Sequence, residues 1–154
     1  MANFLTKLFG SKSQRDLREL TPIMNECLAA YDKIKTLSND ELRAKTAEFK
    51  QIIRQSVETE QKQLDALKAR VENEIDMDVE EKQKIYTQIE ELDKKIYEST
   101  QSVLNRLLPE AFAVVKDTAR RFTENEKVEV TATEYDKYLS TVKDNVNIVG
   151  DKAY

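Results

Sequence analysis

The sequence predicts a mostly α-helical fold that contains a long antiparallel helical hairpin. No glycine occurs between positions 10 and 150, so nearly the whole chain lacks the residue that most often ends helices. Charged residues make up 35% of the chain and aromatic residues only 7%. Long amphipathic helices tolerate this balance because each helix buries only one stripe of its surface. Apolar residues also recur at heptad spacing in the middle of the chain, which is typical of paired helices.

The composition excludes several classes of function. The chain has no histidine, which is the usual general base near neutral pH and a frequent metal ligand. A glycine-rich phosphate loop is also absent. We therefore predict no catalytic residue, no cofactor-binding residue and no metal site in this segment. The net charge of −4 gives no reason to expect nucleic acid as a partner. A single cysteine cannot form an internal disulfide, which suits a reducing compartment.

The first twenty residues have an apolar strip beside positive charge. Their side chains carry four basic and two acidic groups, a local charge of +2 in an acidic chain. Such a segment can lie on an anionic membrane surface, or its apolar strip can dock on the protein's own body. The apolar strip and the basic residues nearest to it are Phe4, Leu5, Lys7, Leu8, Phe9, Lys12 and Arg15.

Helix signals follow over residues 17–50. A 3–4 spacing of apolar residues continues from Leu17 to Ile34, and Pro22 either starts a new helix or kinks a continuous one. Ser38 and Glu41 have the spacing of a capping box, with Leu37 placed to form a hydrophobic staple. We therefore expect a helix to start here and to run to about residue 75.

The hairpin is predicted from the stretch that follows. Asp76–Asp78 is the first interruption, and Asp78 with Glu81 repeats the capping-box pattern, so a second helix should begin at Val79. Apolar residues then recur in steps of four, three, four and seven. They are Ile85, Ile89, Leu92, Ile96 and Val103. Residues 58–106 carry thirteen acidic and eight basic side chains, and this net negative charge disfavours contact of the hairpin with an anionic membrane.

A third helix is expected to start at Leu108–Pro109, because proline suits the first helical turn. Its apolar face would include Phe112, Val115 and Phe122. After residue 123 the pattern changes to short β-like runs near Val130 and Ile148, separated by one or two helical turns.

Three stretches resemble one known family. They are Phe4–Ser11 (FLTKLFGS), Leu37–Phe49 (LSNDELRAKTAEF), and Leu108–Val115 (LPEAFAVV) with Ala119–Arg121. In this order they are similar to the N-terminal blocks of the SecA family, the motor ATPases of bacterial preprotein translocation. The resemblance covers about residues 1–50 and 107–122 and leaves the hairpin uncovered. The family's GEGKT phosphate loop, which follows these blocks, is not among these residues.

The resemblance implies a domain organisation. Residues 1–20 would be an amphipathic membrane- or channel-contacting N-terminus. Residues 21–50 and 107–122 would begin the scaffold of the first nucleotide-binding domain, an α/β domain that is incomplete here. Residues 51–106 would be an inserted, coiled-coil-like helical hairpin, and residues 123–154 a partly ordered truncated region.

The resemblance also implies a function. The parent protein would hydrolyse ATP with Mg²⁺ to drive preproteins through the SecYEG channel, from the cytoplasmic face of the bacterial inner membrane. This segment would contact the channel and anionic phospholipid and would bind no cofactor itself. A homodimer stays an open alternative, and so does a stand-alone coiled-coil adaptor.

Overall fold

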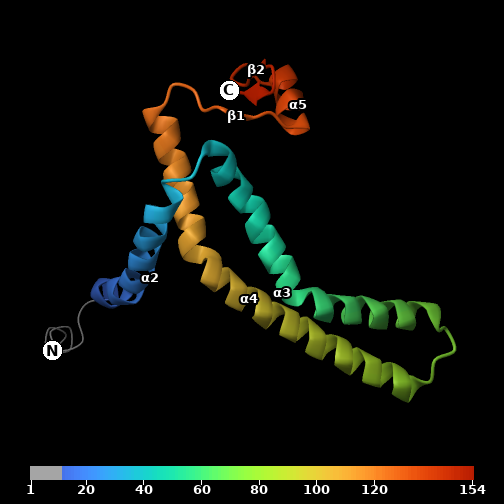
Figure 1. Ribbon diagram of the computed structural model, residues 1–154. Coiled ribbons are helices and arrows are strands. Elements are labelled where there is room, and N and C mark those ends of the chain that lie inside the picture. The colour runs from blue at the N-terminus through green and yellow to red at the C-terminus, as the bar shows by residue number, and fades with distance from the viewer. Residues whose placement is uncertain (1–11) are drawn as a thin grey trace, which may run out of the picture. The chain divides into compact units, whose positions relative to one another are not determined.

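The computed structural model describes residues 12–154 and is mostly helical (Figure 1). Its elements are α2 (Lys12–Ile34), α3 (Asn39–Asn73), α4 (Val79–Glu124), β1 (Val130–Thr131), α5 (Glu134–Val142), β2 (Ile148–Val149) and β3 (Lys152–Ala153). The chain divides into two compact units. One unit, here called the arm, is Thr46–Leu107. The other, here called the base, comprises the chain up to Lys45 together with Leu108–Tyr154.

Helix α2 is continuous through Pro22, so the proline does not start a new helix. Proline has no backbone N–H and leaves the carbonyl four residues earlier without its helical donor. The neighbouring Thr21 adds a hydrogen bond of its own, because its hydroxyl donates to the Leu17 carbonyl at 2.5 Å.

The predicted capping box starts α3. The Glu41 carboxylate accepts from the Ser38 N–H at 2.7 Å, and the Glu41 N–H donates to the Ser38 hydroxyl at 3.2 Å. Leu42, one turn into α3, is buried with Ile34 of α2 and Ala113 of α4. Leu37 packs against this cluster, as expected for the staple. These side chains form the core of the base.

Within the arm, α3 and α4 run antiparallel. The buried cluster consists of Leu64, Ile85 and Ile89. Two ion pairs join the helices, Arg70 with Glu81 and Glu60 with Lys95. The residue that comes later in α3 pairs with the residue that comes earlier in α4, as an antiparallel arrangement requires. Asp78 caps the start of α4 as predicted, since its carboxylate accepts from the Glu80 N–H at 3.0 Å. The Glu81 carboxylate, expected to complete a capping box with Asp78, accepts a hydrogen bond from Arg70.

The prediction of a separate helix starting at Pro109 is wrong. Helix α4 runs without interruption from Val79 to Glu124, with Pro109 inside it. An interior proline costs a helix about 3 kcal/mol. Burial on both sides of it offsets this cost, because Leu107 is buried just before the proline and Ala113 just after it.

A small antiparallel sheet follows α4, with strand order β1-β3-β2. Val130 and Ile148 both pair with Ala153 of β3. Gly150 makes the turn between β2 and β3 at φ 61°, a conformation that favours glycine. The β-like runs and the short helix predicted here are therefore present, and the three strands pair among themselves. Among residues 12–154, no helix combines the length and apolar character needed to cross a membrane.

Candidate functional site

The predicted contact residues lie at the start of the chain. Phe4, Leu5, Lys7, Leu8 and Phe9 fall outside the described residues. Lys12 and Arg15 lie in the first turns of α2, and both side chains are exposed. Contact with an anionic partner requires basic side chains that are exposed in this way.

Apolar side chains are also exposed on α2. Leu17 and Leu20 are 60% and 59% exposed, in the same helix as Lys12 and Arg15.

A second candidate region is a polar cluster inside the base, centred on Asp117. This carboxylate is fully buried and is held by two arginines of its own helix. Arg121 Nε donates to Asp117 Oδ2 at 2.7 Å, and Arg120 Nη2 donates to Asp117 Oδ1 at 2.8 Å. The pairing compensates a charge that would otherwise be costly to bury.

Arg121 extends this cluster to the start of α3. Its two terminal nitrogens donate to the Leu37 carbonyl and to the Asn39 side-chain oxygen. The Asn39 amide nitrogen in turn donates to the Glu129 carbonyl at 2.8 Å, just before β1. One guanidinium thus ties the end of α4 to the residues that begin α3.

Two further contacts fasten the sheet and α5 to α3. The Asp40 carboxylate accepts from the Thr131 N–H at 2.8 Å and from its hydroxyl at 2.7 Å. Arg43 Nη2 donates to both carboxylate oxygens of Asp136, at 2.8 Å to Oδ1 and 2.7 Å to Oδ2. Asp136 also completes the capping box of α5 with Thr133. These carboxylates are therefore structural anchors.

The electrostatics of the anchors favour their charged forms. Burial raises the pKa of Asp117, but hydrogen bonds from Arg120 and Arg121 outweigh burial and hold that pKa below its ordinary value. Burial likewise opposes the hydrogen bonds from Thr133 and Arg43, yet the pKa of Asp136 is lowered. Neither carboxylate is poised near neutral pH, as a general acid or base would need to be.

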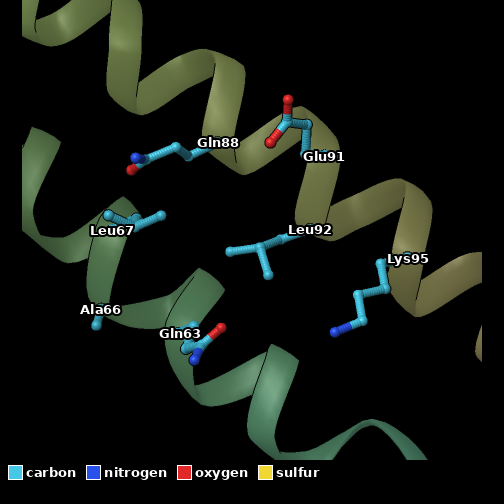
Figure 2. Close-up of a pocket in the computed structure, with 7 residues that line it drawn as sticks. All are labelled: Gln63, Ala66, Leu67, Gln88, Glu91, Leu92 and Lys95. Atoms are coloured by element: carbon cyan, nitrogen blue, oxygen red, sulfur yellow. The ribbon is translucent and has the colours of Figure 1, made fainter.

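The described part of the chain holds one further feature, an open groove of about 540 Å³ between the helices of the arm (Figure 2). Leu67 and Leu92 line it together with Gln63, Gln88 and Glu91. Figure 2 shows Leu92 and Lys95 directed from α4 toward α3. Lys95 is engaged with Glu60 at 2.7 Å. Among residues 12–154, no group of three or more acidic or cysteine side chains is placed to hold a metal ion.

Comparison with known proteins gives these features a context. The model of the SecA DEAD-like domain family matches residues 5–135, most of the chain. The chain belongs to the SecA family. The SecA resemblance that the three sequence blocks predicted is thereby confirmed.

Relatives cover almost the whole chain. The protein translocase subunit SecA of Parabacteroides distasonis is 49% identical over 150 residues, which are 97% of this chain and 13% of that protein. The SecA subunit of Azobacteroides pseudotrichonymphae is 43% identical over 99% of the chain, and that of Bacteroides fragilis 43% identical over 97%. The chain therefore spans only about 13% of the length of these relatives. No solved structure matches it.

The structure brings the second and third SecA blocks together. Leu42 of the second block packs on Ala113 of the third, and Lys45 Nζ lies 2.9 Å from Glu110 Oε1. The Arg121 hydrogen bond to Leu37 joins the same two blocks. Sequence reasoning missed this network and the Arg43–Asp136 pair, because the partners lie about 80–90 positions apart and no local pattern marks them. Because the alignments cover 97–99% of the chain, these SecA relatives share the arm.

Proposed function

We propose that the chain is the N-terminal part of a SecA-type translocase subunit that couples ATP hydrolysis to the export of preproteins through the SecYEG channel. The observation that carries the proposal is the family match over nearly the whole chain, at 40–49% identity to translocase subunits. The two family blocks that pack together in the base support it. The relatives give no support to a stand-alone adaptor.

In this proposal the base begins the first nucleotide-binding domain of the motor. The arm is a coiled-coil-like hairpin inserted between the two blocks, and its buried leucine–isoleucine seam and cross-helix ion pairs support that interpretation. The nucleotide itself, ATP with Mg²⁺, would bind to a phosphate loop in the parent protein, which these residues lack. The segment contributes scaffold and contact, and no catalytic step.

The start of the chain would make the contact with the cytoplasmic face of the inner membrane and with the channel. Lys12 and Arg15 support this because both basic side chains are exposed in the first turns of α2. The apolar residues Phe4, Leu5, Leu8 and Phe9, with Lys7, would supply the rest of the interfacial surface.

A translocation assay tests the proposal. The full-length protein that contains these residues is added to inverted inner-membrane vesicles carrying SecYEG, with a radiolabelled preprotein and ATP. We expect ATP-dependent protection of the preprotein from external protease, and none with a non-hydrolysable ATP analogue. Protease sensitivity that is the same with and without ATP would contradict the proposal.

Calorimetry tests the proposal that residues 1–154 bind no nucleotide by themselves. Titrating ATP with Mg²⁺ into residues 1–154 should give no binding heat, because no backbone loop here can cradle the phosphates. Saturable binding at micromolar ATP would show that the segment itself holds nucleotide. The full-length protein serves as the positive control.

A further inference from the structure

The turn between α3 and α4 presents two apolar side chains to solvent. Ile75 and Val79 are 91% and 81% exposed, more than any other large apolar side chain in residues 12–154. Turns are dominated by glycine, proline, asparagine, aspartate and serine, and not by β-branched residues such as these. Neither side chain belongs to the buried cluster of the arm or packs against it. The folding of the hairpin therefore gives no reason for either residue.

The turn is fixed by contacts on both sides. Arg70 of α3 pairs with Glu74 at 3.0 Å and, across the turn, with Glu81 at 2.5 Å. The Asp78 carboxylate caps the start of α4. Met77, in the middle of the turn, packs against the buried cluster of the arm. The turn, here called the arm tip (residues 74–79), thus uses one apolar side chain for the core and leaves two outside it.

The arm tip is also strongly acidic. Residues 72–81 contain six acidic side chains and no basic one. They are Glu72, Glu74, Asp76, Asp78, Glu80 and Glu81. Apolar side chains that are exposed among charged ones mark a surface for interaction, and the sign of the charge indicates the sign of the partner.

The length of the arm makes its tip available to a separate molecule. Figure 1 shows the turn, in green, at the free end of the hairpin. Thr46 is the first residue of the arm and Asn73 the last residue of α3. At about 1.5 Å per residue, this part of α3 is roughly 40 Å long. The arm tip is therefore far along the hairpin from the residues that join the arm to the base.

We propose that the arm tip binds a separate protein, in an apolar pocket whose rim carries lysine and arginine side chains. Such a rim would compensate the carboxylates of residues 72–81, and the pocket would remove Ile75 and Val79 from water. Both side chains are stiff at χ1, and the turn that carries them is already ordered, so binding costs little conformational freedom. This partner is additional to those of the proposed translocation function.

The charge of the arm tip disfavours other occupants. An anionic membrane and a nucleic acid would both be repelled by the carboxylates of residues 72–81. The tip of a second copy would bring two sets of like charges together. Because the tip is small, we expect its complex to belong to the weak, transient class of protein–protein interfaces.

Synthetic peptides of defined composition test this chemistry. A fluorescein-labelled amphipathic helix of leucine and lysine is titrated with residues 1–154, and fluorescence anisotropy reports binding. One control peptide has glutamine in place of leucine, which keeps the charge and removes the apolar face. The other has glutamate in place of lysine, which keeps the apolar face and reverses the charge. We expect saturable binding of the leucine–lysine peptide and, for both controls, binding that is weaker by at least about ten-fold.

Two double variants locate the binding. Ile75→Gln with Val79→Gln removes both exposed side chains of the arm tip without changing its charge, and should weaken binding of the leucine–lysine peptide by about ten-fold or more. The thermal midpoint should stay unchanged, because neither side chain is in the core. The matched control, Tyr86→Gln with Tyr97→Gln, removes two exposed apolar side chains elsewhere on the arm and should leave binding near the wild-type value.

Several results would overturn the inference. Equal weakening by the two double variants, or equal binding of the glutamine–lysine peptide, would mean that the arm tip is not recognised as an apolar site. The full-length protein must bind the leucine–lysine peptide with the same dependence on Ile75 and Val79, and loss of that dependence would mean that the parent protein covers the tip.

Two further measurements test the other occupants directly. Sedimentation velocity of residues 1–154 should show no self-association that depends on Ile75 and Val79, and such self-association would assign the tip to a second copy. Flotation with zwitterionic phospholipid vesicles should show no binding that these residues control, and such binding would assign the tip to a membrane. None of these readouts measures translocation, so the proposed function fails separately, through absence of ATP-dependent preprotein protection.

Discussion

Arg121 connects the end of α4 to the start of α3 within the base. Replacing it with Met removes one partner of the buried Asp117 and both hydrogen bonds to the start of α3. Breaking a buried ion pair by removing one partner costs roughly 3 kcal/mol. We expect Arg121→Met to lower the free energy of unfolding by about that amount, measured by urea denaturation followed by circular dichroism. The control Arg106→Met changes an exposed arginine of the same helix, and equal losses in both variants would contradict a special role for Arg121.

The pH dependence of stability follows from the same carboxylate. Because the pKa of Asp117 is lowered in the folded state, its contribution is complete above the unfolded value of about 3.9 and is lost as the pH falls through the folded pKa. We expect the thermal midpoint of unfolding to decrease as the pH is lowered below about 4. The decrease should be smaller in Asp117→Asn. The exposed Asp144→Asn is the control and should keep the wild-type profile. A profile of Asp117→Asn parallel to wild type would refute this role.

At the scale of elements, the arm should behave as a body with its own small core. Leu64→Ala deletes a buried side chain between Ile85 and Ile89 and should destabilise the arm by about 2–5 kcal/mol. Hydrogen exchange of peptides from residues 46–107 measures this loss directly. The control Ile75→Ala truncates a side chain that is 91% exposed near the turn, and it should leave exchange unchanged. Similar exchange in the two variants would mean that the seam does not hold the arm together.

The elements differ in how far the sequence could predict them. The Ser38–Glu41 box and the Asp78 cap were predictable because each depends on residues within one helical turn. Ile85 and Ile89 were predictable as buried residues because their spacing places them on one face of a single helix. The helix start predicted at Pro109 was wrong because the local sequence fits a proline in the first turn and a proline inside a helix equally well. The burial of Leu107 before Pro109 and of Ala113 after it is a tertiary feature that the local sequence does not show. The hydrogen bonds from Arg121 to the start of α3 and the Arg43–Asp136 anchor join residues about 80–90 positions apart, and no local sequence pattern marks such contacts.

At the scale of the whole molecule, the chain combines an acidic arm with a basic start. Residues 58–106 carry a net charge of −5 and would be repelled by an anionic surface. Residues 1–20 carry a net charge of +2 and would be attracted to it. Charge alone therefore favours contact of residues 1–20, and not of residues 58–106, with an anionic membrane. This division agrees with the proposal that the start of the chain makes the contact and the arm stays in solvent.

Vesicle flotation tests that division with two charge-matched variants. Lys12→Glu with Arg15→Glu should weaken binding of residues 1–154 to anionic phospholipid vesicles by at least about 30-fold at low salt, since each basic residue near such a surface contributes about 1 kcal/mol and the new carboxylates are repelled by it. Lys82→Glu with Lys84→Glu makes the same change of net charge in the arm, at two exposed positions, and should leave binding near the wild-type value. High salt should abolish the difference, because the attraction is screened beyond the Debye length. Equal weakening by both variants would mean that net charge alone governs the binding, and the start of the chain would then have no special role in membrane contact.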